Sequence, residues 1–254
     1  MNLSLYERVS ELHGALPWGS VLDAGTGPGS MRWLLSLQTE RWTAVTGSPR
    51  MAEVVRKETG DRIRAGDRLI VGNWLEPELL ANETYDVVLA DYLLGAVDGF
   101  APYWQDQLFP RLRPHVAGRL YVIGLEPYVP HVPTDPDGRL ANEIGRLRDA
   151  CLLVSGDRPY REYPMHWVLR HLELAKFRVI DAQKIPVRYG ERFVVTQLDL
   201  CDQALQRLRD RALAVALQSH VASLRDRALA FVARAGGIRH GYDYIVVAEP
   251  ANKP

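Results

Sequence analysis

Apolar runs of strand length alternate with helical stretches over the first half of the chain. Short runs rich in Val, Ile, Leu and aromatic residues predict strands, and apolar residues three or four positions apart between them predict helices. The alternation predicts an α/β fold whose parallel sheet is covered on both faces, with any ligand at the carboxyl ends of the strands. We expect strands at 18–23, 42–46, 68–72, 85–90 and 118–124, and helices at 28–38, 48–58 and 102–112.

The pattern changes after the fifth predicted strand. Prolines recur at every third position over 127–136, which is the period of a polyproline II helix, so this segment is expected to be extended and stiff. Helices are predicted at 137–154 and 163–176, followed by a strand at 177–182. The resulting proline-rich loop and helix insertion, 127–162, can wall a pocket or act as a surface spacer.

A second insertion, 191–240, precedes a last strand predicted at 244–248. Its Arg/Leu/Ala-rich part, 202–235, carries two apolar stripes displaced by about 150° at the helical period, and the phase changes near residues 218–220. Either one long helix packs on opposite sides in its two halves, or two helices meet there. The stretch can be an ordinary packed insertion, a cap over a pocket or a dimer face.

Length and composition describe a single neutral domain. A chain of 254 residues fits one domain over 1–254, with an N-terminal helix within 1–16. The 31 basic and 31 acidic residues balance, so we expect no nucleic acid partner. Cys151 and Cys201 lack paired spacing and no apolar run is long enough to cross a bilayer, so we expect a reduced, cytoplasmic protein without membrane insertion.

The most informative motif joins the first predicted strand to a helix and reads Asp23-Ala24-Gly25-Thr26-Gly27-Pro28-Gly29. Glycines at every second position allow a sharp turn and let a ligand approach closer than a Cβ would permit. A dinucleotide-binding loop has its third glycine one residue later, where this chain has Ser30. The acid before the glycines would repel a pyrophosphate but suits a cationic group such as an amine or a sulfonium.

This motif resembles the first motif of class I S-adenosylmethionine-dependent methyltransferases. The segments 46–51, 69–74, 85–94 and 118–124 resemble later motifs of that Rossmann-like family in the same order, although Thr46 stands where the family has a ribose-binding acid. The resemblance implies a doubly wound, mostly parallel seven-stranded sheet with an antiparallel last strand and helical insertions. It also implies S-adenosyl-L-methionine as the cofactor.

The resemblance assigns a cofactor site residue by residue. Thr46 can make one hydroxyl bond to the ribose where a carboxylate would accept two. Asn73 retains the polar capacity to meet the adenine amine, and Trp74 supplies the apolar cover of the ring. The predicted cofactor-binding residues are Asp23, Gly25, Thr26, Gly27, Gly29, Thr46, Met51, Asn73, Trp74 and Asp91.

Methyl transfer by in-line displacement requires alignment of two atoms, and it needs a general base only when the nucleophile arrives protonated. Asp91 and Tyr92 follow the fourth predicted strand and are the best-placed candidates. His166 is the preferred histidine base, with a surface or packed histidine as the alternative reading. No carboxylate-and-asparagine set has metal-ligand spacing, so we expect metal-independent catalysis with Asp91, Tyr92 and His166 as catalytic residues.

Three functions fit this sequence. The first is a methyltransferase that acts on oxygen or nitrogen of a small-molecule acceptor. The second is a cofactor-binding protein without transfer activity, which the substitution of the ribose-binding acid by Thr46 suggests. The third is methylation of a protein or peptide docked on the 202–235 helices, and the same helices are the candidate interface of a homodimer.

Overall fold

The computed structural model describes residues 4–251 and divides into two compact units. The first unit comprises Met1–Leu125, Arg161–Lys184 and Tyr244–Pro254, and the second comprises Glu126–Tyr160 and Ile185–Asp243. The single domain over 1–254 stays a prediction, and the two predicted insertions lie largely in the second compact unit. The helices of the two predicted insertions bury their apolar faces against one another and so have a core of their own.

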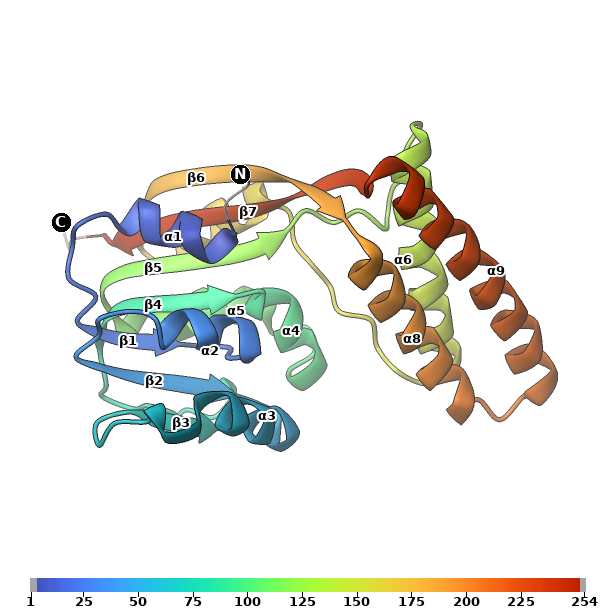
Figure 1. Cartoon of the computed structure of the whole chain (residues 1–254). Coiled ribbons are helices and arrows are strands. Elements are labelled where there is room, and N and C mark those ends of the chain that lie inside the picture. The colour runs from blue at the N-terminus through green and yellow to red at the C-terminus, as the bar shows by residue number, and fades with distance from the viewer. Residues whose placement is uncertain (1–3, 252–254) are drawn as a thin grey trace. The chain divides into compact units, whose positions relative to one another are not determined.

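A seven-stranded sheet with the order β3-β2-β1-β4-β5-β7-β6 forms the centre of the first unit. Strands β1 to β5 pair in parallel, and Figure 1 shows β7 running opposite to β5 and β6. The predicted doubly wound, mostly parallel sheet with an antiparallel last strand is confirmed. The strands are β1 (Ser20–Asp23), β2 (Arg41–Thr46), β3 (Arg68–Val71), β4 (Tyr85–Asp91), β5 (Val116–Leu125), β6 (Phe177–Tyr189) and β7 (Ile238–Pro250).

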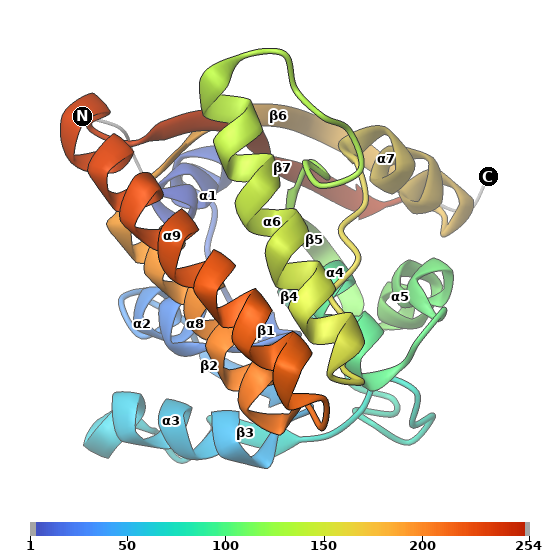
Figure 2. The same cartoon turned by 90° about the vertical axis from the view of Figure 1, so that its right-hand side faces the viewer.

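Helices cover both faces of this sheet (Figures 1 and 2). One face carries α1 (Leu5–His13), α2 (Pro28–Leu34) and α3 (Pro49–Thr59). The other carries α4 (Leu93–Phe100), α5 (Gln105–Leu112) and α7 (Met165–Leu174). The strand order reverses between β1 and β4, so the crevice expected for a ligand lies at the carboxyl ends of these two strands.

Helix α4 was not predicted from the sequence. Its segment is almost uniformly apolar, so it shows no polar face from which a helical period can be recognised. It also follows β4 with only Tyr92 between them, and that residue has the left-handed φ of 46°. A single non-glycine residue in this region thus turns the chain from strand to helix at the carboxyl edge of the sheet.

The second unit contains three long helices, α6 (Pro136–Val154), α8 (Glu191–Arg207) and α9 (Arg211–Ala235). Their shared core includes Ile144, Leu198 and Leu224. The break in the 202–235 stretch lies between α8 and α9, and α9 passes through residues 218–220 without interruption. Of the two expected arrangements, the one in which two helices meet at 218–220 is therefore wrong. The side chain of Asp210 sets the true boundary, because it accepts a hydrogen bond from the Leu213 N–H at 3.0 Å and caps α9.

Candidate functional site

The glycine loop is held by hydrogen bonds on both sides. The Thr26 N–H donates to the Val45 carbonyl at 2.8 Å, and the indole N–H of Trp74 donates to the Ala24 carbonyl at 2.7 Å. The Ser30 hydroxyl accepts from the Gly27 N–H at 3.1 Å and donates to the Gly27 carbonyl at 3.2 Å. Ser30, at the position of the missing third glycine, therefore fixes the start of α2 through its side chain.

The three loop glycines serve different purposes. A Cβ on Gly25 would lie 2.9 Å from Cδ1 of Leu93, and a Cβ on Gly29 would lie 2.9 Å from the hydroxyl of Tyr6. These two glycines make room for parts of the protein itself. A Cβ on Gly27 would meet no atom within 4 Å, so the space in front of this residue is open to a ligand.

Two buried carboxyl groups lie beside this loop. Asp23 ends β1 and is 1% exposed, and Asp91 ends β4, where it accepts a hydrogen bond of 2.7 Å from the hydroxyl of Tyr6 on α1. The buried Oδ2 of Asp23, Oγ1 of Thr26 and Oδ1 of Asp91 have no hydrogen-bond partner among residues 4–251. We refer to Asp23, Thr26 and Asp91, with Tyr6 above them, as the carboxyl-end site.

Electrostatics point to a cationic ligand at the carboxyl-end site. Burial raises the pKa of Asp23 to about 7, opposed by the neighbouring hydroxyls of Ser30 and Thr26, while the charge of Asp91 adds a smaller rise. Burial also raises the pKa of Asp91, partly offset by the Tyr6 hydrogen bond. No Lys or Arg in the described part of the chain pairs with either carboxylate. A positively charged group placed here would relieve both the desolvation and the mutual repulsion.

The predicted ribose and adenine residues lie at the ends of neighbouring strands. Thr46 ends β2, and its hydroxyl accepts from the Ser48 N–H at 3.3 Å. Asn73 follows β3, where its side-chain oxygen accepts from the Leu75 N–H at 3.0 Å and its amide donates to the Phe100 carbonyl at 3.2 Å. Met51 lies in the first turn of α3. Parallel strands bring these positions to one edge of the sheet.

The motif predicts that Trp74 covers the adenine ring, but in the structure Trp74 is buried and Phe100 is the exposed aromatic residue nearby. Trp74 is 4% exposed and packs into the core with its indole bound to the loop, which gives it a supporting role. Phe100, at the end of α4, is 43% exposed, and a Cβ on Gly47 would lie 2.9 Å from its ring. The sequence reading missed Phe100 because the helix that carries it was not recognised. Its ring is a candidate apolar surface for the adenine ring of a cofactor at the carboxyl ends of the strands.

The three predicted catalytic residues do not form one cluster. Asp91 and Tyr92 are consecutive at the end of β4, and Tyr92 adopts its left-handed conformation there. His166 lies in the first turn of α7 and is exposed, and no hydrogen bond to its ring is found within residues 4–251. The role of His166 as a base stays a prediction. Tyr6, from the N-terminal helix, contacts Asp91 directly.

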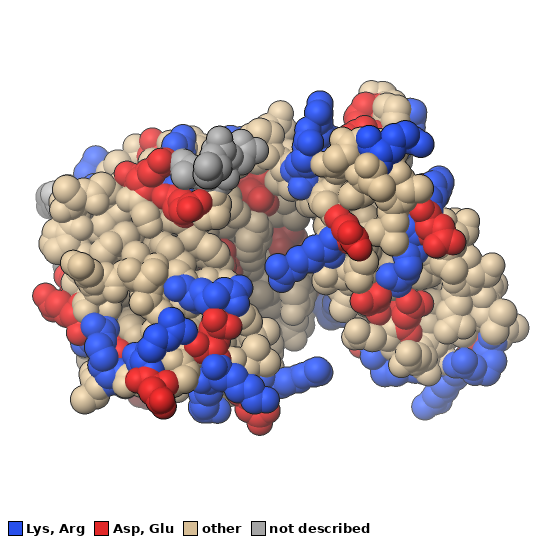
Figure 3. All heavy atoms as spheres, viewed as in Figure 1, with Lys and Arg blue, Asp and Glu red and all other residues tan. Residues whose placement is uncertain are grey.

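Metal and membrane features are sparse in the described part of the chain. Residues 4–251 contain no group of three or more His, Cys, Asp or Glu side chains arranged to hold a metal ion. None of their helices is both long and apolar enough to span a membrane. On the face drawn in Figure 3, basic and acidic side chains are intermixed, without the single-sign surface typical of nucleic-acid binding.

Comparison with known proteins shows the fold. The chain is similar to a Bacillus halodurans protein assigned only provisionally as a methyltransferase, with 14% identity, a TM-score of 0.63, and 98% and 100% of the two chains covered. It is similar to the mycolic acid cyclopropane synthase CmaA1 complexed with SAH and CTAB, with 19% identity, a TM-score of 0.54, and 97% and 86% of the two chains covered. It is also similar to the cyclase SpnF, with 16% identity, a TM-score of 0.58, and 98% and 80% of the two chains covered. No family model and no curated protein matches the sequence.

These likenesses confirm the resemblance to class I methyltransferases at the level of fold. The similar structures include proteins described as methyltransferases, as cyclopropane synthases and as a cyclase. One fold thus carries several reactions in this group, so the activity of this chain has to be argued from its own site.

Proposed function

We propose that this protein is an S-adenosylmethionine-dependent methyltransferase that acts on oxygen or nitrogen of a small molecule without a metal ion. One observation carries the proposal: Asp23 and Asp91 are buried beside an open glycine loop, with oxygen atoms that lack partners and with no cation paired to them in the described residues. The cofactor brings an ammonium and a sulfonium, which are the charges that such a pair of carboxylates stabilises.

The residues of the site fit the cofactor in three respects. The open side of Gly27 leaves space for a ligand against the backbone. The orphaned oxygen of Asp23 and the Thr26 hydroxyl can accept hydrogen bonds from an ammonium group. Phe100 and Asn73 present an aromatic ring and an amide at the neighbouring strand ends. When bound, the cofactor supplies an activated methyl group.

The chain's own residues would then bind, orient and exclude water. Tyr6 holds Asp91 through its hydroxyl, and burial raises the pKa of Tyr6 so that it remains a proton donor in that bond. Asp91 keeps one free oxygen, which can accept a proton or a hydrogen bond from an acceptor nucleophile. Because displacement at a methyl carbon depends on alignment, this positioning is the main contribution we assign to the protein.

Calorimetric titration with S-adenosylmethionine and S-adenosylhomocysteine tests the binding step. We expect micromolar binding by the wild-type protein and at least a hundredfold loss in Asp23→Asn. A screen of phenols, carboxylic acids, amines and heterocycles for methylated product by mass spectrometry then tests transfer. Absence of binding at millimolar cofactor would refute the proposal, whereas binding without any product would favour the second candidate.

The second candidate is a cofactor-binding protein without methyl transfer to oxygen or nitrogen. Thr46 motivates it, because its hydroxyl is already engaged by the Ser48 N–H and offers the ribose less than a carboxylate would. A fold shared with a cyclopropane synthase and a cyclase supports it as well. Methylation of a protein or peptide remains a third outcome, which radiolabelled cofactor and a mixture of peptides would detect.

A further inference from the structure

Helix α9 contacts its own unit with only one side. Its buried residues, Ala214, Val221, Leu224 and Ala228, face the core shared with α6 and α8. The opposite side is exposed, and Val215 there has 62% of its surface exposed. Figure 2 shows α9 lying along α8 in the second unit. We call the exposed side, which carries Arg211, Val215, Ser219, Ala222 and Asp226, the outer face of α9.

The outer face is complementary to itself about its midpoint, because a base is matched by an acid and a larger apolar side chain by a smaller one. Arg211 and Asp226 are equidistant from the midpoint between Gln218 and Ser219, and so are Val215 and Ala222. On an α-helix these five outer-face positions lie on one side, because each follows the last by three or four residues. An antiparallel second helix centred on the same midpoint would therefore place each Arg211 opposite an Asp226, and each Val215 opposite an Ala222.

The charges of the outer face are available for a partner. Within residues 4–251 neither Arg211 nor Asp226 takes part in an ion pair; Arg211 makes only a 3.3 Å contact to the Leu208 carbonyl. The neighbouring Arg227, by contrast, is paired with Glu143, and Arg225 is paired with Asp199 and Asp202. Within the described residues, Arg225 and Arg227 thus have acidic partners in their own unit, whereas Arg211 and Asp226 on the outer face have none.

We propose that the outer face of α9 binds a second copy of this chain as an antiparallel, two-fold symmetric helix pair. A two-fold interface requires a surface that complements itself, and the outer face does so in both charge and shape. Ser219 and Ala222 at its centre are small, which lets two helix axes approach within about 8 Å. Two Arg211–Asp226 pairs close the ends of a contact that spans 16 residues, or about 22 Å of helix.

Sedimentation velocity over a range of protein concentrations tests the assembly. We expect a monomer–dimer equilibrium in the wild-type protein. Arg211→Asp and Asp226→Arg should each weaken dimerisation at least tenfold, because like charges then face each other across the two-fold axis. The double variant Arg211→Asp/Asp226→Arg restores opposite charges and should recover most of the affinity. Arg192→Asp, an exposed charge reversal on α8, is the matched control and should dimerise like wild type.

Cysteine cross-linking tests the register directly. When Val215→Cys protein is mixed with Ala222→Cys protein under oxidised glutathione, we expect a disulfide between the two variants. Each variant alone should cross-link far less. Circular dichroism establishes that each variant is folded. A protein that is monomeric at every concentration, or a dimer indifferent to both charge reversals, would overturn the proposal. It is independent of the proposed function, since neither measurement requires cofactor or acceptor.

Discussion

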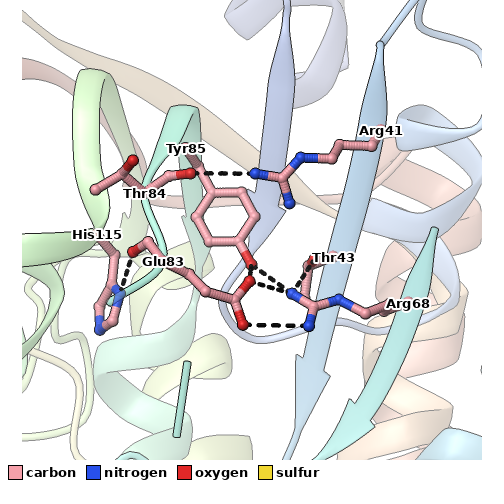
Figure 4. Close-up of polar contacts among 7 residues, drawn as sticks. All are labelled: Arg41, Thr43, Arg68, Glu83, Thr84, Tyr85 and His115. Carbon is pink, nitrogen blue, oxygen red and sulfur yellow. Dashed lines mark hydrogen bonds and ion pairs between the residues drawn. The ribbon is translucent and has the colours of Figure 1, made fainter. Parts of the chain in front are cut away.

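The amino ends and the carboxyl ends of the strands in the central sheet carry the same kinds of side chain but use them in opposite ways. At the amino ends of the strands, Arg68 donates hydrogen bonds to Glu83, to the Tyr85 hydroxyl at 3.1 Å and to Thr43 at 3.2 Å. Arg41 lies 5.1 Å from the centre of the Tyr85 ring. Figure 4 shows this amino-end network, which comprises Arg41, Thr43, Arg68, Glu83, Thr84, Tyr85 and His115. Its carboxylate, Glu83, is paired with Arg68.

The carboxyl-end site contrasts with this network in its unpaired acids. Hydrogen bonding by the Arg68 guanidinium lowers the pKa of Glu83, whereas burial without a cation raises the pKa of Asp23 to about 7. A paired carboxylate stabilises the folded chain, while a buried unpaired one destabilises it until a ligand arrives. Polar groups at the amino ends of the strands therefore serve stability, and on the proposed function those at the carboxyl ends serve binding.

The sharpest test of this contrast is Asp23→Asn. We expect at least a hundredfold loss of S-adenosylmethionine affinity, which corresponds to about 3 kcal/mol for a charged hydrogen-bonded contact. The same change should raise the unfolding temperature of the ligand-free protein at pH 8, because it removes a buried unpaired charge. Calorimetry and thermal unfolding measure the two effects. A variant that binds cofactor normally would contradict the role of Asp23.

Gly27→Val should block the open side of the loop. We expect at least tenfold weaker cofactor binding with little change in stability, because a Cβ there meets no protein atom and the backbone of Gly27 is extended. Gly190→Val is the matched control, since Gly190 is also open and extended but lies before α8. Equal cofactor affinity in the Gly27 variant and wild type would show that the ligand does not approach this part of the loop.

Lowering the pH should weaken cofactor binding. Protonation of Asp23, with its pKa of about 7, removes the charge that attracts an ammonium, so affinity should fall about eightfold from pH 7.5 to pH 6. The stability of the ligand-free protein changes in the opposite sense. Because the pKa of Asp23 is higher in the folded than in the unfolded state, its contribution to the free energy of unfolding is greatest below pH 4 and is lost as the pH rises through 7. Titrations in one buffer system at several pH values measure the first effect, and a flat profile would contradict it.

Glu83→Gln should give the reverse pattern from Asp23→Asn. Removing the charge leaves Arg68 without its acid, so we expect a loss of about 1 kcal/mol in the free energy of unfolding for this partly exposed pair. That loss should shrink as acid protonates Glu83 in the wild-type protein, because the lowered pKa makes its contribution one that is present at neutral pH. Cofactor affinity should be unchanged, and any large drop would mean that the two edges are coupled.

Thr46→Asp should have the smallest effect. One carboxylate oxygen can accept the hydrogen bond that Ser48 now donates to the hydroxyl, and the other can face a ribose. We expect cofactor affinity to rise a few-fold or to stay the same, measured against Thr46→Val, which removes the acceptor. A sharp fall in the aspartate variant would mean that the ribose lies elsewhere.

Local patterns predicted the parts of the fold that they determine. Strands β1 to β5 and the turn at Gly25–Gly29 were anticipated because apolar runs and glycines act within a few residues. The partner of Asp91 could not be anticipated, because Tyr6 reaches it from 85 positions away. The motif placed Trp74 correctly at the end of β3, but its burial depends on contacts with Ala24 that the sequence does not reveal.

The second unit shows the same division. The position of α6 followed from helical spacing, but most of α8 lies before the predicted 202–235 stretch. The junction at Leu208–Asp210 depends on one capping aspartate within a stretch of good helix formers. The change of phase near residues 218–220 lies within α9 and did not mark the break between the two helices. The separate core of this unit arises from packing between distant segments and left no local signal.

The contact between Tyr6 and Asp91 also constrains the order of events during synthesis. Helix α1 can form early, because Ser4 and Glu7 cap it from within its own first turn. Its anchoring partner emerges from the ribosome only after β4 has been made, and domains fold as their segments become available. The N-terminal helix must therefore wait undocked until the residue it holds exists, although it is the first helix of the unit to be made.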